Sequence, residues 1–111
     1  MALIVYDLAL QMLRGIKPLI DKVARHDRGL ADQLQRSAQS SFLHIAEAQS
    51  ARGRNEVARF TNALCESREA RAAMAVALAW GYLTEREAQP ADQSLDRMAA
   101  LLWGLTHNRP R

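Results

Sequence analysis

Apolar residues recur every three or four positions along almost the whole chain, and the strict alternation typical of strands is nearly absent. This spacing predicts helices over residues 4–25, 30–52, 55–80 and 84–107. Short turns separate these segments, so neighbours along the chain are expected to be antiparallel. At 111 residues the chain fits one domain. The pattern therefore predicts an all-α fold, an antiparallel up-down four-helix bundle that fills residues 1–111.

Residues that favour helix ends lie between these segments. Asp27 and Asn55 are suitable N-caps for the second and third helices, because their side-chain oxygens accept hydrogen bonds from the first turn. Gly53 and Gly81 are typical of the position just past a helix end, where glycine tolerates a left-handed backbone. These residues indicate where the chain turns.

Two prolines interrupt the predicted helices. Pro18 lies inside the first helix, where the missing N–H is expected to kink it. Thr84 and Glu87 match a capping box at the start of the fourth helix. Pro90 leaves two alternatives: residues 84–89 form a separate turn before the main helix, or one helix is kinked at the proline.

The first helix carries more apolar surface than one bundle needs. Beside its core-facing stripe runs a second apolar stripe, and two tryptophans lie at the ends of other helices. Exposed apolar patches of this size usually become interfaces. We therefore predict self-association through Tyr6, Leu10, Leu13, Ile20, Trp80 and Trp103. The alternative is that both tryptophans cap the ends of the core of a monomer.

Composition excludes disorder and favours a soluble globular protein, since 49% of the residues are hydrophobic and 24% are charged. The longest apolar run, residues 72–80, is far short of the roughly 20 residues that a membrane helix needs. The N-terminus lacks the basic start of a secretory signal. A single cysteine, Cys65, is consistent with a reducing compartment. We expect a cytoplasmic protein with no membrane partner.

The net charge is +3, and arginine supplies most of the positive charge. A high arginine content suits phosphate recognition, although codon usage in a GC-rich genome explains it equally simply. In an up-down bundle, one end collects the turn between helices two and three together with both termini. We predict a basic end that contacts RNA or DNA phosphates through Arg52, Arg54, Arg59, Arg109 and Arg111. The alternative is a solvated end, and no aromatic residue interleaves the patch for base stacking.

No catalytic constellation emerges from the sequence. His44 and Glu47 share a helix face, but a metal site in a bundle needs further Glu-x-x-His units from other helices. A hydrogen bond is the expected role of this pair. Cys65 has no histidine nearby in sequence, so a packed or half-buried thiol is expected rather than a nucleophile. We predict no catalytic residue, no cofactor and no metal.

The second helix carries a recognisable pattern. The stretch Leu30-Ala-Asp-Gln-Leu-Gln-Arg-Ser-Ala38, followed by His44-Ile-Ala-Glu47, resembles a bacterial four-helix-bundle family encoded by intervening sequences in large-subunit ribosomal RNA genes. Gly81-Tyr-Leu-Thr-Glu85 and Leu101-Leu-Trp-Gly-Leu105 continue the resemblance in order. The accessory variability proteins of diversity-generating retroelements look like relatives. By this resemblance the chain looks like a divergent member, with Phe42 where the family usually has proline.

The resemblance implies a non-enzymatic bundle, a tendency to form ring-like homo-oligomers such as pentamers, and nucleic-acid or reverse-transcriptase partners in some branches. Together with the basic end, it leads us to expect an oligomeric interaction protein that binds RNA or DNA. The alternative is a purely structural homo-oligomer that acts as a scaffold for a protein partner.

Overall fold

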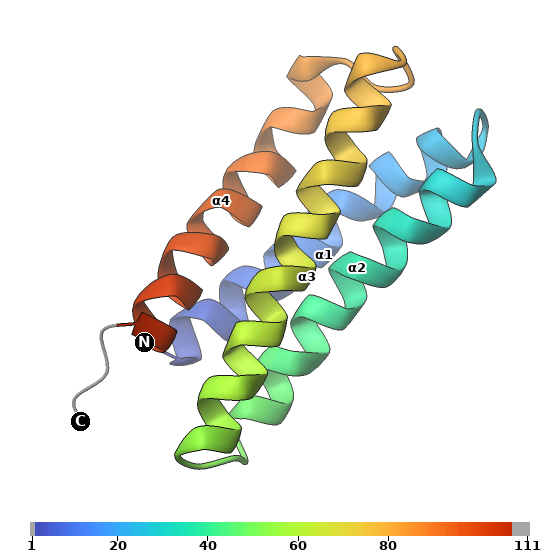
Figure 1. The fold of residues 1–111 in the computed structure, drawn as a ribbon. Helices are drawn as coiled ribbons and strands as arrows, with labels where there is room; N and C mark the ends of the chain where they lie inside the picture. Colours follow the sequence, from blue (N-terminus) through green and yellow to red (C-terminus); the bar gives the residue numbers. More distant parts are fainter. Residues whose placement is uncertain (1, 108–111) are drawn as a thin grey trace.

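The computed structural model describes residues 2–107, which form four helices. They are α1 (Ala2–Ala24), α2 (Arg28–Ala48), α3 (Arg54–Ala79) and α4 (Glu85–His107). Figure 1 shows each helix antiparallel to the next, with the start of α1 and the end of α4 at the same end of the bundle. The α2–α3 turn also lies at this end and projects beyond the end of α4. The predicted all-α up-down bundle is confirmed.

Each helix buries one apolar stripe along the bundle axis. Fully buried side chains come from all four helices, and their spacing of three or four residues matches one face of an α-helix. The largest of them are Met12, Ile16, Leu34, Ile45, Phe60, Met74, Leu95, Met98 and Leu102.

Small residues line the contact between α2 and α3. Ala38, Ser41, Ser67, Ala70 and Ala77 are buried completely, which lets the two helices approach closely. The buried serines satisfy their hydroxyl groups within their own helices. Ser41 Oγ donates to the Ala38 carbonyl and Ser67 Oγ to the Leu64 carbonyl, each at 2.8 Å. Both buried hydroxyl groups are therefore hydrogen-bonded.

Three predicted helix-end signals form as expected. Asp27 caps α2, with its Oδ1 accepting from the Leu30 N–H at 3.0 Å. The capping box of α4 is complete, because Glu87 accepts from the Thr84 N–H at 2.7 Å and Thr84 Oγ1 accepts from the Glu87 N–H at 3.2 Å. After α3, Gly81 adopts φ 77° and Tyr82 N–H bonds to the Ala77 carbonyl at 2.8 Å. This is the Schellman pattern of a glycine-terminated helix.

The α2–α3 turn differs from the prediction. α2 ends at Ala48, so residues 49–53 form a longer turn than the sequence indicated. α3 begins at Arg54, and its N-cap is Gly53 rather than the expected Asn55. Gly53 has φ 61°, a conformation that L side chains rarely adopt. The glycine therefore sets the entry into α3 instead of the exit from α2.

Both prolines lie inside continuous helices. Pro18 is within α1 and Pro90 within α4, so the alternative of a separate turn over residues 84–89 is wrong. Each proline leaves the carbonyl four residues earlier without a helical donor. Both are exposed, so water can satisfy these carbonyls.

Candidate nucleic-acid interface

The α2–α3 turn presents two arginines to solvent. Arg52 and Arg54 flank Gly53, are exposed, and form no ion pair with any residue in the range 2–107. The other members of the predicted basic set differ from them. Arg109 and Arg111 lie outside the described residues. The structure therefore locates the accessible charge of this end in the turn itself.

Arg59 lies one turn further along α3 and is paired. Its Nη1 is 3.1 Å from Oε2 of Glu47 on α2, and both side chains are about half exposed, at 45% and 52%. This ion pair closes the α2–α3 turn from the outside. Because Glu47 offsets its charge, Arg59 contributes less to attracting an anion than Arg52 or Arg54 does.

An open groove of about 560 Å³ lies between the end of α2 and the start of α3. It is lined by Glu47, Ser50, Ala51, Asn55, Ala58, Arg59 and Asn62. The N-cap of α3 is a glycine, which has no side chain to accept hydrogen bonds from the N–H groups of the first turn. Such N–H groups attract anions. Glu56 in the same turn opposes that attraction.

The formal charges of this end are balanced among the described residues. The positive charges come from Arg52, Arg54 and Arg59. The negative charges come from Glu47, Glu56 and Asp7, and Asp7 of α1 is exposed near the same end. Among the described residues this end therefore has no net formal charge, which differs from the predicted basic end.

The predicted apolar stripe of α1 is partly exposed. Tyr6, Leu10 and Leu13 are half-buried, and Tyr6 packs on Phe42 of α2 with ring centroids 5.0 Å apart. Leu43, next to Phe42, is 49% exposed and was not predicted as a surface residue. These five residues, from α1 and α2, define what we call the α1–α2 apolar patch.

Ile20 does not belong to this patch. It is only 7% exposed and packs in the core, which corrects its assignment to an interface stripe. Its side chain faces inward because the buried face drifts around the helix over its 23 residues.

Both tryptophans are exposed, so neither is enclosed as a cap on the core. Trp80 is 70% exposed at the end of α3, and Val76, one turn earlier, is 40% exposed. Trp103 is 47% exposed and stacks on His107 with ring centroids 3.3 Å apart. The two tryptophans lie at opposite ends of the bundle.

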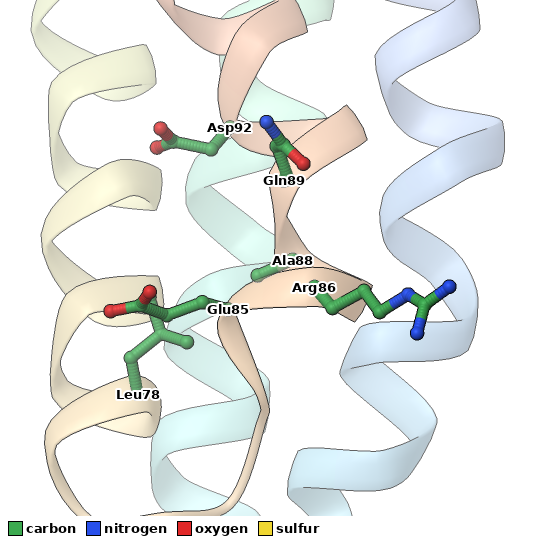
Figure 2. A pocket seen from close by; sticks show the side chains of 6 residues that line it. All are labelled: Leu78, Glu85, Arg86, Ala88, Gln89 and Asp92. Atoms are coloured by element: carbon green, nitrogen blue, oxygen red, sulfur yellow. The ribbon is translucent and has the colours of Figure 1, made fainter.

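A second groove, of about 500 Å³, lies between the end of α3 and the start of α4 (Figure 2). Asp92 on its rim is held by Arg71, whose Nε and Nη2 lie 3.0 and 3.2 Å from the two carboxylate oxygens. This hydrogen bond raises the pKa of Arg71 above its ordinary value. Arg71 also donates to Asp96 at 3.1 Å. The groove thus has a structural ion-pair network on one side.

Two expectations about reactive residues were wrong. Nδ1 of His44 is buried and has no hydrogen-bond partner among residues 2–107, and Glu47 pairs with Arg59 instead. Cys65 is exposed rather than packed or half-buried. Within residues 2–107, no three His, Cys, Asp or Glu side chains gather as a metal site would require. None of the four helices, over the same range, is long and apolar enough to cross a membrane.

Comparisons with known proteins point to one family. Residues 1–104 match the family model described as 23S rRNA-intervening sequence protein. A crystal structure from Bacteroides thetaiotaomicron, described as a protein with unknown function from the S23 ribosomal protein family, has the same fold. Its TM-score is 0.85 at 21% sequence identity, over 93% of this chain and 98% of that one. No curated protein matches the chain.

Proposed function

The chain belongs to the 23S rRNA-intervening sequence protein family, and from that premise we propose that it is a non-enzymatic, oligomeric protein that contacts nucleic acid through its α2–α3 turn. The observation that carries the proposal is the exposure of Arg52 and Arg54 on either side of Gly53, without an ion-pair partner among the described residues. Two such guanidinium groups on one short turn are suited to bind adjacent phosphates.

The mechanism is phosphate contact that does not depend on base sequence. Arginine forks bind phosphate oxygens and release the counterions condensed on the nucleic acid. The uncapped N–H groups at the start of α3 add donors beside the same turn. Arg109 and Arg111 follow α4 at this end of the chain and extend the proposed site. Arg59 supports the turn through Glu47 and is a lesser contact.

Assembly is the second part of the proposal. The α1–α2 apolar patch exposes Leu43 and half-exposes Leu10, and such a surface is stabilised when another copy covers it. A pentamer is the arrangement that the family resemblance favours. Each added copy repeats the α2–α3 turn, so that weak phosphate contacts combine into tighter binding.

Titration with a structured RNA tests the proposal. The double variant Arg52→Glu/Arg54→Glu is compared with Arg68→Glu/Arg97→Glu, which changes two exposed arginines near the middle of the bundle by the same charge. We expect wild type and the control to bind at low salt and weaken at moderate salt, while the first variant binds at least tenfold more weakly. Absence of wild-type binding at low salt, or equal effects of the two variants, refutes the assignment.

A scaffold without nucleic acid is the alternative. Its support is the exposed pair Val76 and Trp80 on α3, an apolar surface far from the α2–α3 turn. Purification of the protein with its native partners, with and without nuclease, separates the two functions. A partner protein that stays bound after nuclease treatment, and whose binding is lost in Trp80→Ser, favours the scaffold.

A further inference from the structure

The end of the bundle opposite the α2–α3 turn is tied together across two turns. His26 in the α1–α2 turn stacks on Tyr82 in the α3–α4 turn, with ring centroids 4.8 Å apart and planes within 6°. Beside them, Lys22 Nζ lies 2.7 Å from Oε2 of Glu87 at the start of α4. These contacts join segments that are more than fifty residues apart in the chain, so the two turns form one surface.

The acidic groups of this surface are largely used inside the fold. Asp27 accepts the capping hydrogen bond from Leu30 N–H. Glu87 accepts hydrogen bonds from both Lys22 and the Thr84 N–H. Glu85 is exposed and carries no such bond. The formal charges of this end nearly cancel, and of these three carboxylates Glu87 is the one with a cationic partner, Lys22, among the described residues.

Three arginines at this end remain accessible. Arg25 directly precedes His26 in the α1–α2 turn, Arg28 is the first residue of α2, and Arg86 follows the α3–α4 turn. All three are exposed and form no ion pair within the part of the chain that the structure describes. Figure 2 shows Arg86 pointing away from Glu85, to the side of α4 where α1 lies. The three arginines thus belong to the same two turns as the stacked rings or to the helix starts that follow them, and His26 is itself exposed.

We propose that these five residues, the His26–Tyr82 platform with Arg25, Arg28 and Arg86, form a second binding site that takes single-stranded nucleic acid. One base stacks on the exposed His26 ring, and the neighbouring phosphates contact the arginines. The inference rests on the proposed function, because it requires a nucleic-acid ligand, but it assigns a different surface and a different part of that ligand.

The chemistry of the platform favours an unpaired strand. Stacking on a side-chain ring requires a free base face, which a continuous duplex does not offer. Aromatic rings beside arginines are the arrangement by which proteins bind single strands without sequence preference. The α2–α3 turn has arginines but no ring pair on it, so it suits phosphates alone. A molecule with both turns can hold a structured RNA together with its unpaired end.

Abasic sites give the sharpest test, because they keep the phosphates and remove the base. Binding of the full chain is measured for a short single-stranded RNA and for the same strand with abasic positions. Wild type should bind the base-bearing strand at least about fivefold more tightly, since stacking contributes about 1 kcal/mol or more per base. His26→Ala should remove this preference, while His26→Phe should restore it. Circular dichroism confirms that the variants keep their helices.

The arginines are tested by salt dependence. Each phosphate contact with a single strand contributes roughly 0.7 to the slope of log K against log salt. The triple variant Arg25→Gln/Arg28→Gln/Arg86→Gln should therefore reduce this slope by about 2. Arg52→Gln/Arg54→Gln should leave the preference for bases unchanged. Equal binding of the two strands by wild type, or an unchanged slope in the triple variant, overturns the inference while the proposed function stands. A third outcome is that the triple variant loses binding to structured RNA while Arg52→Gln/Arg54→Gln keeps it. This outcome refutes nucleic-acid contact through the α2–α3 turn and retains the His26–Tyr82 platform.

Discussion

The carboxylate of Glu87 joins the end of α1 to the start of α4. It accepts hydrogen bonds from Lys22 of α1, at 2.7 and 2.9 Å, and from the Thr84 N–H at the start of α4, at 2.7 Å. The hydrogen bond from Lys22, followed by that from the Thr84 backbone, lowers the pKa of Glu87 from its ordinary 4.5 to about 2. Because these partners stabilise the ionised form, the folded state prefers Glu87 charged.

This lowered pKa predicts an acid-dependent stability. A carboxyl whose pKa falls on folding stabilises the native state above its unfolded pKa, and that contribution disappears as the pH falls through the folded pKa. For Glu87 the loss should therefore extend from about pH 4.5 down to about 2. Thermal unfolding measured across this range should show a smaller decline in Glu87→Gln than in wild type. Parallel curves for the two proteins would contradict the assigned contacts.

Gly15 and Gly53 predict opposite effects of the same substitution. An added Cβ meets nothing within 4 Å at either glycine, but Gly53 has φ 61° whereas Gly15 lies inside α1. Gly15→Ala should raise the free energy of unfolding by about 0.5–1 kcal/mol, since alanine lowers the entropy cost of the helix. Gly53→Ala should lower it by at least about 1 kcal/mol through backbone strain. Urea titration of both variants measures this; destabilisation by Gly15→Ala would contradict the helix assignment.

At the scale of the elements, the close contact between α2 and α3 depends on small side chains. Ala70 is fully buried there, while Ala72, two residues along the same helix, is exposed. Ala70→Leu should destabilise the protein by about 1–3 kcal/mol, because a well-packed contact cannot absorb the added carbons. Ala72→Leu should have little effect. Chemical denaturation compares the pair, and equal effects would show that the α2–α3 contact is looser than the structure has it.

Element boundaries were predictable where the chemistry is local. Thr84 with Glu87, Asp27 and Gly81 act within one turn of the backbone, and each forms the contact that its residue type predicts. The end of α2 was missed because residues 49–52 contain neither glycine nor proline to indicate a stop. The environments of Ile20 and Cys65 depend on how whole helices pack against one another, which residue spacing does not determine.

At the scale of the whole molecule, the α1–α2 apolar patch predicts concentration-dependent association. Leu43→Glu places a charge at the exposed leucine of the patch, so desolvating it on association becomes unfavourable. Thr61→Glu adds the same charge at an exposed position of α3 and serves as the control. Analytical ultracentrifugation should find wild type and Thr61→Glu associated and Leu43→Glu dissociated. A monomeric wild type would contradict self-association through the α1–α2 apolar patch.

In the candidate sites, as in the fold, local features were predictable from the sequence and contacts between separate elements were not. The sequence places Arg52 and Arg54 on either side of Gly53, at the boundary between two predicted helices, and their exposure is consistent with that position. It does not indicate that Glu47 engages Arg59, or that His26 stacks on Tyr82, because each contact joins two separate helices or turns. Charge counts per end therefore predicted a basic end without revealing which charges are accessible.

The most direct test of nucleic-acid contact is the salt dependence of binding to one structured RNA. Wild-type affinity should fall steadily as salt rises, because counterions are released at each phosphate contact. Each phosphate contact with a paired segment contributes roughly 0.9 to the slope of log K against log salt. The slope should therefore be shallower by about 2 in Arg52→Gln/Arg54→Gln than in wild type. An affinity independent of salt, or the same slope in wild type and variant, would contradict phosphate contact through the α2–α3 turn.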